Sequence, residues 1–289
     1  MENVTILKTT ILIHCTDQAG IIHAVTSFLH LKKGNIVYLD QHVDQQVNIF
    51  FMRLECHFPS NDISIDYLKK EFQNKIAALY KMDWTIYADT TKPRMAVFVS
   101  KYNHCLYDLL SRYQSGELRV DIPFILSNHE TLRPIAEQFN IPYHYIPVNK
   151  KNKPQAEAEQ LRLLEKHDID FFVLARYMQI VSNTLISQYQ NRIINIHHSF
   201  LPAFAGAKPY HAAFERGVKI IGATSHYVTE ALDAGPIIAQ DVTTVSHSHS
   251  IKDFIAKGRD LEKIVLSRAV KLHLLHKTMV YNNKTVIFS

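Results

Sequence analysis

Glycine is scarce in this chain, which has only eight among its 289 residues. A dinucleotide-binding fold needs a glycine-rich turn directly after a strand, because the backbone there must approach the pyrophosphate closely. No such turn follows any strand that the sequence predicts. We therefore expect no nicotinamide cofactor, and the sequence predicts no other resident cofactor.

Cysteine is rarer still. Cys15, Cys56 and Cys105 are an odd number without paired spacing, which argues against a disulfide framework and against a thiolate metal site. Seventeen histidines are present, including the pairs His197-His198 and His247-Ser-His249. Neither pair has the i, i+4 helical spacing or the acidic companion that is typical of a metal site. The sequence therefore predicts no bound metal.

Long apolar runs are also missing. No stretch approaches the length of a membrane span, and residues 1–15 lack the cationic start and the small-residue cleavage site of a signal peptide. These absences favour a cytoplasmic protein without a membrane partner.

The net charge of +5 suits anionic ligands, but no dense Lys/Arg run indicates a nucleic-acid surface. The length allows two domains.

Residues 1–87 follow the order strand, helix, strand, strand, helix, strand. The period of the apolar residues predicts strands at 5–14, 35–43, 48–57 and 84–87, and helices at 21–32 and 63–81. This order is the split βαβ arrangement of a ferredoxin-like (βαββαβ) fold.

The turn Asp17-Gln18-Ala19-Gly20-Ile21 opens the first of these helices. It resembles the ligand loop of ACT domains, which are small modules that bind amino acids and pair side by side. A glycine-containing turn at a helix N-terminus offers free N–H groups to a carboxylate. The resemblance implies that Asp17, Gln18, Gly20 and Ile21 hold a small amino-acid effector, and that residues 1–87 form a homo-oligomer. In the alternative, Asp17 only caps the helix and Gly20 only eases the turn.

A polar segment, 88–93, ends in Pro93 and is expected to be a linker. From residue 94 to 289, short apolar strands alternate with helices. Strands are expected at 95–100, 122–127, 144–148, 170–174 and 192–196, and helices at 106–113, 130–139, 155–166 and 250–276. The alternation predicts a Rossmann-like α/β domain with a mostly parallel sheet and a site at the carboxyl ends of the strands. Residues 281–289 are not assigned.

Asn195 and His197 lie at one such strand end, and Asp233 lies in a Leu-Asp-Ala-Gly-Pro turn. At i and i+2 on a strand, Asn195 and His197 point to the same face, where both can donate to the oxyanion that forms when water or an amine attacks a formyl group. A carboxylate at Asp233 can orient the imidazole. Taken singly, each residue also has an ordinary structural explanation, as a hydrogen-bonded histidine or a turn-forming aspartate.

Three blocks carry these residues in order: 195–209, 222–229 and 232–236. Together they resemble the signature of the folate-dependent formyltransferase family, and the likeness extends over about residues 94–245. The resemblance implies that Asn195, His197 and Asp233 are catalytic and that His226 lies near them. It also implies a loop that holds the pterin and, opposite it, a second wall of the folate site. The folate-binding residues that it implies are Met178, Gln179, Ile180, His226, Val228, Thr229 and Leu232.

The acceptor of the formyl group is the next question. Transformylases of purine synthesis cradle the acceptor's phosphate in a Gly- and Ser-rich loop, but residues 99–106 here contain no glycine. The stretch 201–209 also resembles methionyl-tRNA formyltransferases. However, the fifty or so residues after Asp241 are expected to be helical and leave no room for the RNA-binding barrel of those enzymes.

An ACT-like module followed by this block, without an amine site, resembles the formyltetrahydrofolate deformylases. That likeness implies hydrolysis of 10-formyltetrahydrofolate to formate and tetrahydrofolate, which supplies formate for purine synthesis and balances the one-carbon folate pools. Folate is then a substrate rather than a cofactor. Two alternatives are formyl transfer to an unidentified small amine and a non-catalytic amino-acid or folate sensor, although binding alone needs no Asn, His and Asp trio.

Overall fold

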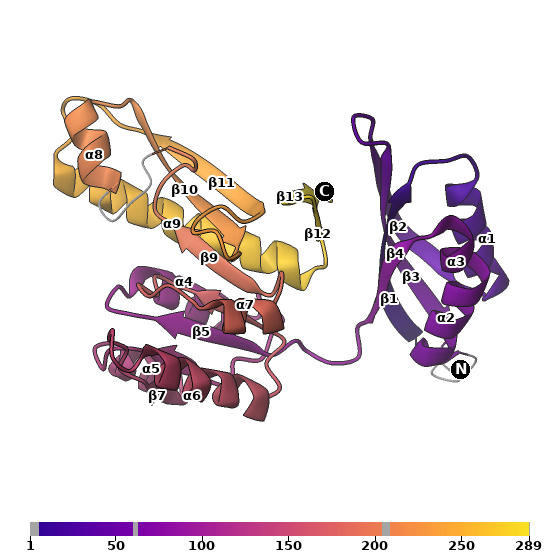
Figure 1. The fold of residues 1–289 in the computed structure, drawn as a ribbon, viewed down its shortest axis with the longest axis horizontal. Coiled ribbons are helices and arrows are strands. Elements are labelled where there is room, and N and C mark those ends of the chain that lie inside the picture. The colour runs from indigo at the N-terminus through magenta and orange to yellow at the C-terminus, as the bar shows by residue number, and fades with distance from the viewer. Residues whose placement is uncertain (1–5, 60–62, 204–208, 289) are drawn as a thin grey trace. The chain divides into compact units, whose positions relative to one another are not determined.

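The computed structural model describes residues 6–59, 63–203 and 209–288. The chain divides between Lys92 and Pro93 into two compact units, with Phe288 grouped with the first (Figure 1). Within the described ranges, no helix combines the length and the apolar character that crossing a membrane requires.

The first unit contains an antiparallel sheet in the order β2-β3-β1-β4. Its strands are β1 (Ile6–Thr16), β2 (Asn35–Asp44), β3 (Ile49–Pro59) and β4 (Asp83–Ala88), and its first helix is α1 (Ile21–Leu31). The second helical segment consists of α2 (Ile65–Phe72), a π-helical turn (Gln73–Ala77) and α3 (Ala78–Tyr80). The order of elements is the predicted βαββαβ order.

The π-helical turn departs from the single regular helix expected over 63–81. Leu68 and Phe72 are buried one turn apart on α2, and the wider turn then buries both Ile76 and Ala77. The π-helical turn inserts one extra residue into the helix, and both side chains remain in the core cluster of the first unit.

The second unit contains a seven-stranded sheet in the order β11-β10-β9-β8-β5-β6-β7. Its strands are β5 (Met95–Val99), β6 (Ile125–Ser127), β7 (Tyr143–Tyr145), β8 (Phe171–Leu174), β9 (Ile193–His197), β10 (Ile220–Tyr227) and β11 (Ile237–Thr244). The helices are α4 (His104–Gln114), α5 (Arg133–Gln138), α6 (Lys153–Lys166), α7 (Asn183–Gln188), α8 (Pro209–Arg216) and α9 (Ile251–Leu274). Strands β5 to β9 are parallel, and β10 pairs antiparallel with both β9 and β11.

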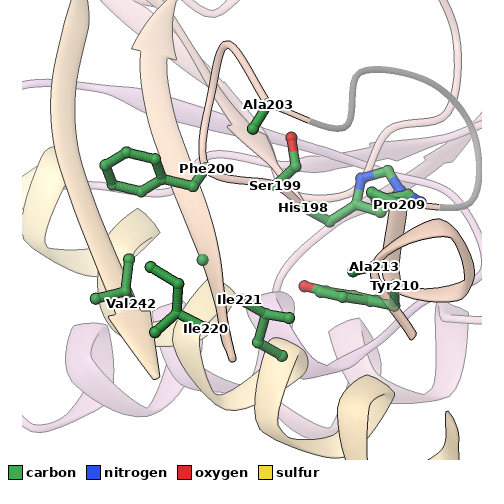
Figure 2. A pocket seen from close by; sticks show the side chains of 11 residues that line it. His198, Ser199, Phe200, Ala203, Pro209, Tyr210, Ala213, Ile220, Ile221 and Val242 are labelled. Atoms are coloured by element: carbon green, nitrogen blue, oxygen red, sulfur yellow. The ribbon is translucent and has the colours of Figure 1, made fainter. Parts of the chain in front are cut away.

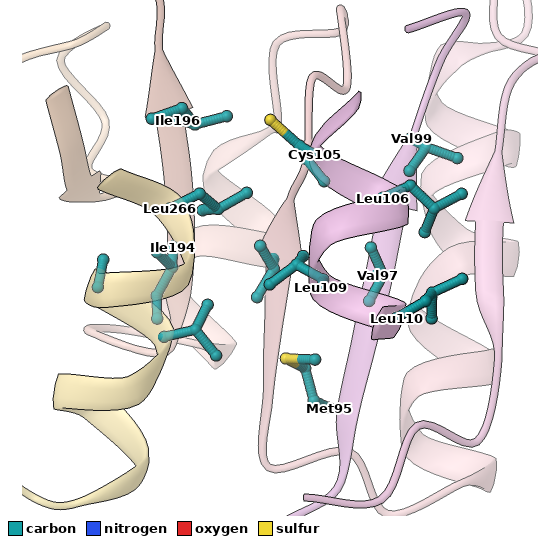
Figure 3. Packing of buried hydrophobic residues seen from close by; sticks show 14 of the residues in the cluster. Met95, Val97, Val99, Cys105, Leu106, Leu109, Leu110, Ile194, Ile196 and Leu266 are labelled. Atoms are coloured by element: carbon teal, nitrogen blue, oxygen red, sulfur yellow. The ribbon is translucent and has the colours of Figure 1, made fainter. Parts of the chain in front are cut away.

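Both faces of this sheet are covered, which explains why its central strands β5 and β8 are apolar and buried throughout. On β5, Val97 and Val99 pack with Leu109 of α4 and Leu266 of α9 in one cluster, shown in Figure 3. Alternate residues such as Phe98 belong to a second cluster with α6 and α7. The predicted mostly parallel, doubly covered α/β sheet is thus confirmed.

Other expectations need correction. The segment after Asp241 is not wholly helical, because β11 continues to Thr244 and α9 is followed by an antiparallel hairpin of β12 (Thr278–Tyr281) and β13 (Lys284–Ile287). Strands β10 and β11 and the hairpin were not foreseen. The two hairpin strands have only four residues each, which is too short for an alternating pattern to stand out.

A close contact in the second unit allows a test of the fold. Ala is normally better than Gly inside a helix by about 0.8–1.0 kcal/mol. At Gly258 of α9, however, a Cβ would lie 2.1 Å from Cζ of Tyr210 on α8. We expect Gly258→Ala to lower the free energy of unfolding by about 1–3 kcal/mol, as measured by urea denaturation. In a Tyr210→Ala background the ring is gone, so the same change should stabilise. Destabilisation in both backgrounds would contradict the overlap.

Candidate active site

The last parallel strand, β9, presents two polar side chains on one face. Ile194 and Ile196 belong to the core cluster with α9, so the pleat turns Asn195 and His197 to the opposite face, as their spacing predicts. The antiparallel strand β10 lies beside β9 and sets His226 directly across from Asn195. Sheet pairing alone therefore brings an amide and an imidazole together.

The loop between β10 and β11 brings Asp233 to the same place. The N–H of Tyr227 donates to the carbonyl of Pro236 at 2.9 Å and closes the loop. Asp233 adopts a left-handed conformation with φ 54, which Asp tolerates better than most residues. A Cβ at Gly235 would lie 1.8 Å from the carbonyl oxygen of Tyr227. Glycine is therefore required at position 235 for the loop to fold back tightly.

Four side chains meet at this point. Asp233 Oδ2 lies 3.2 Å from Nδ1 of His197, and Asp233 Oδ1 lies 3.7 Å from Nε2 of His226. The same Nε2 is 3.2 Å from Nδ2 of Asn195. His197 and His226 are buried, and Asp233 keeps about a fifth of its side chain exposed. The structure thus joins the predicted trio and inserts His226 between Asn195 and Asp233.

The partners of the two imidazoles indicate where their protons lie. A carboxylate only accepts hydrogen bonds, so Nδ1 of His197 carries the proton that faces Asp233. His226 Nδ1 is 2.9 Å from the carbonyl of Tyr227, which also only accepts. When neutral, His226 therefore offers the lone pair of Nε2 to Asn195. This leaves one N–H of the Asn195 amide for another acceptor.

The other nitrogen of His197 is the most informative atom in the site. Nε2 of His197 is buried and has no hydrogen-bonding partner within the described part of the chain. Leaving a buried polar atom unpaired costs free energy, and such exceptions concentrate at functional sites. With Nδ1 protonated, neutral His197 presents a lone pair at Nε2 that can take a proton from a bound molecule.

Asp233 is strongly acidic in this setting. The hydrogen bond from His197, and then the nearby imidazole of His226, lower the pKa of Asp233 well below its usual value and outweigh the effect of burial. The carboxyl is therefore ionised throughout the neutral range. It can hold an imidazole and stabilise an imidazolium, which is what general acid–base chemistry at a carbonyl requires.

Comparison with known proteins agrees with this geometry. The family model described as "Formyl transferase" matches residues 93–270. A formyltetrahydrofolate deformylase from Synechocystis sp. is 48% identical over 289 residues, which cover all of both chains. This chain belongs to the formyltetrahydrofolate deformylase family. A deformylase from Bacillus subtilis is 45% identical over 98% of this chain and 94% of its own. The crystal structure of a Pseudomonas syringae deformylase superposes with a TM-score of 0.94 at 45% identity, over 100% of this chain and 96% of that one.

Apart from His226 on β10, the residues expected to hold folate lie on two loops of this deformylase-family chain. Met178, Gln179 and Ile180 follow β8, where the N–H of Met178 donates to Oγ of Ser100 at 3.0 Å. Met178 and Ile180 are exposed, and so is Leu232 on the loop after β10. Val228 and Thr229 on the same loop are anchored by hydrogen bonds. The N–H of Val228 donates to the carbonyl of Ile193, and Thr229 Oγ1 donates to the carbonyl of Ala231. Folate binding by these residues stays a prediction.

The predicted effector loop lies in the first unit. Gly20 is the N-cap residue of α1 with φ 92, and no side chain in the described ranges caps this helix end. Asp17 therefore does not act as the cap, which removes one of the two structural explanations. Its own N–H donates to the carbonyl of Asn48 at 2.9 Å. The first turn of α1 keeps N–H groups that are not satisfied by a capping side chain.

Sequence reasoning missed that His226 contacts both Asn195 and Asp233. It also missed one buried cluster. His104, Cys105 and Glu262 place one ligand atom each within 4.8 Å of one another. However, Glu262 Oε2 already lies 2.8 Å from His104 Nε2 and 3.3 Å from Arg176 Nε, and burial raises the pKa of the Cys105 thiol well above its usual value. A neutral thiol is a poor ligand. The cluster is better described as an ion-pair network than as a metal site.

A cavity of about 110 Å³ lies beside the segment that follows β9 (Figure 2). Its walls are mostly apolar side chains of α8, β10 and β11, and its polar contributions come from His198, Ser199 and Tyr210. Ligand pockets for drug-sized molecules span roughly 300–1,000 Å³, so this cavity cannot enclose a folate. The stretch 204–208, part of the motif shared with methionyl-tRNA formyltransferases, lies outside the described residues.

The contacts of Asp233 predict its titration. Because its folded pKa is the lower one, ionised Asp233 stabilises the fold above its unfolded pKa of about 3.9, and this contribution is lost as pH falls toward the folded value. ¹³C NMR between pH 3 and 7 should show the carboxyl still ionised at pH 3.8, the ordinary pKa of this group. His197→Ala should raise this pKa, and His226→Ala should raise it less, because His226 lies farther away. An unchanged titration in His197→Ala would show that the contact does not form.

Proposed function

We propose that this chain hydrolyses 10-formyltetrahydrofolate to formate and tetrahydrofolate. The observation that carries the proposal is the buried His197, which faces Asp233 through Nδ1 and has Nε2 unpaired. The full-length relatives named formyltetrahydrofolate deformylase support the same reaction. The product formate would serve purine synthesis, and the reaction would balance the one-carbon folate pools.

The reaction begins with attack of water on the formyl carbon. Nε2 of His197 takes a proton from the water as the C–O bond forms, and Asp233 stabilises the resulting imidazolium. Asn195 and the imidazolium donate to the oxyanion of the tetrahedral intermediate. The intermediate then breaks its C–N10 bond as N10 receives the proton from His197, which releases tetrahydrofolate and formic acid. The acid ionises to formate.

The loop after β5 supports water rather than a phosphate-bearing amine as the acceptor. Ser100 Oγ donates to Oδ1 of Asn128 at 2.6 Å, and α4 starts only a few residues later, at His104. The ring of Tyr102 has Arg176 and Arg259 within 5.1 and 5.7 Å of its centre. A phosphate cradle needs several converging N–H groups on a glycine-rich backbone, and bulky side chains occupy this loop instead.

The first unit is proposed to regulate the second. Residues 1–87 would form an ACT-like module that pairs with its copy in a homo-oligomer, 88–93 would be the linker, and 94–289 the catalytic domain. Gly20 and the uncapped start of α1 support a small amino acid as effector, because its carboxylate would accept from the free N–H groups.

Formate release by the purified chain tests the reaction. With 10-formyltetrahydrofolate and no amine present, we expect steady formation of formate and tetrahydrofolate in equal amounts. Asn195→Ala removes an oxyanion donor and should lower kcat by about 10²–10³. Asp233→Asn, made separately in the wild-type chain, should abolish most of the activity.

Three controls separate the alternatives. Ser248→Ala changes an exposed serine outside the site and should leave the rate at the wild-type level. Formyl transfer that exceeds formate release when small amines are added would favour the transferase. Binding of substrate without turnover, with or without amino acids, would favour the sensor.

Calorimetric titration tests the effector. We expect one small amino acid to bind the full chain, and Gly20→Val to weaken that binding, because a branched side chain at φ 92 distorts the turn. If the coupling acts on binding, a folate analogue must change amino-acid affinity by the factor that the amino acid changes folate affinity. Absence of binding by all twenty amino acids, with and without the analogue, would remove the regulatory role.

A further inference from the structure

The C-terminal hairpin lies beyond the region matched by the formyl transferase family, which ends at residue 270. After α9, His276 adopts φ 49 and the N–H of Lys277 donates to the carbonyl of Leu272, which turns the chain back. Strands β12 and β13 then pair along their whole length, from Thr278 with Ile287 to Tyr281 with Lys284. Strand β13 contacts β11, the strand that leaves the Asp233 loop (Figure 1).

The tip of this hairpin is a tight turn. Asn282 and Asn283 have φ 45 and 59, and a two-residue turn of type I′ requires positive φ at both central positions. Asparagine is among the few residues that adopt this conformation readily. The turn therefore has a suitable residue at each position.

Asn283 also makes a contact outside the hairpin. Its Nδ2 donates to the carbonyl of Ala234 at 2.8 Å. Ala234 directly follows Asp233, and its own N–H donates to the carbonyl of Ala231 at 3.3 Å. The hairpin tip thus holds the peptide next to the carboxylate that faces His197.

The base of the hairpin is attached to the same site. The hydroxyl of Tyr227 lies 2.8 Å from Thr278 Oγ1 and 2.8 Å from His273 Nδ1. Burial lowers the pKa of His273 to about 3, so its imidazole is neutral at neutral pH. Tyr227 follows His226 and accepts from it through the backbone carbonyl. Tip and base therefore hold the residues next to Asp233 and His226.

We propose that hairpin β12–β13 positions Asp233 for hydrolysis, and that Asn283 is a positioning residue that acts through the carbonyl of Ala234. The inference rests on the proposed function, in which Asp233 holds and stabilises His197. A carboxylate orients its imidazole only within a narrow range of geometry, so a small displacement of the turn lowers the rate. Asn283 itself touches no reacting atom.

The test compares two glycine variants of the same turn. Asn283→Gly keeps the turn, because Asn-Gly is a preferred type I′ pair, and removes only the amide that reaches Ala234. Asn282→Gly removes the neighbouring amide and is the matched control. We expect Asn283→Gly to lower kcat for formate release about three- to tenfold, the range for one lost hydrogen bond, with KM close to wild type. Asn282→Gly should keep the wild-type kcat.

A double-mutant cycle separates positioning from general destabilisation. In an Asp233→Asn background, Asn283→Gly should cause little further loss, because its effect passes through Asp233. Additive losses would overturn the proposal, and so would equal kcat values for the two glycine variants.

Hydrogen exchange of the backbone amides at 231–234 gives a readout that needs no turnover. Exchange should be faster in Asn283→Gly than in Asn282→Gly or wild type. If the wild type released no formate, the proposed reaction would fail, yet this comparison would still decide whether the hairpin holds the turn. Equal exchange in all three proteins would show that it does not.

Discussion

The contact between the carboxylate of Asp233 and Nδ1 of His197, 3.2 Å long, is the interaction on which the site depends. It fixes the proton of His197 on the nitrogen that faces the carboxylate and leaves Nε2 open. It also sets demands on the backbone, since Asp233 must adopt a left-handed conformation and position 235 must be glycine for the loop to close on Tyr227. The chemistry of one pair of side chains thus explains the conformation of the whole loop.

The sheet supplies the other half of the arrangement. Strand β9 is the last parallel strand, and β10 returns beside it in the opposite direction. Parallel strands bring their carboxyl ends to one edge, which is where α/β folds place their sites. An antiparallel neighbour then sets His226 across from Asn195 and leads directly into the Asp233 loop. The change of strand direction is what lets two distant segments share one set of hydrogen bonds.

Much of this could be predicted from the sequence, for physical reasons that differ from one feature to the next. The alternation of apolar strands and helices predicts a doubly covered sheet, because both faces of parallel strands must be buried. The i, i+2 spacing predicts that Asn195 and His197 share a face, since the pleat repeats every two residues. These signals are local, and each can be seen within ten or so residues of sequence.

What could not be predicted depends on pairing between distant segments. The role of His226 follows from its register against β9, and no local pattern encodes that register. The ion-pair network of His104, Arg176 and Glu262 joins three separate segments. The short strands of the C-terminal hairpin carry too few residues for a clear period, although the Asn282-Asn283 pair is a turn signal that marks its tip.

Strand β11 is one of the two edge strands of the seven-stranded sheet, and β10 alone lies between it and β9. His226 and Asp233 therefore belong to the edge of the sheet, whereas Asn195 and His197 belong to its interior. Helix α9 packs on β9, β10 and β11 alike, so one helix on the opposite face of the sheet holds both halves of the site. Displacement of that helix would separate His226 from Asn195 while every residue of the site stayed chemically unchanged.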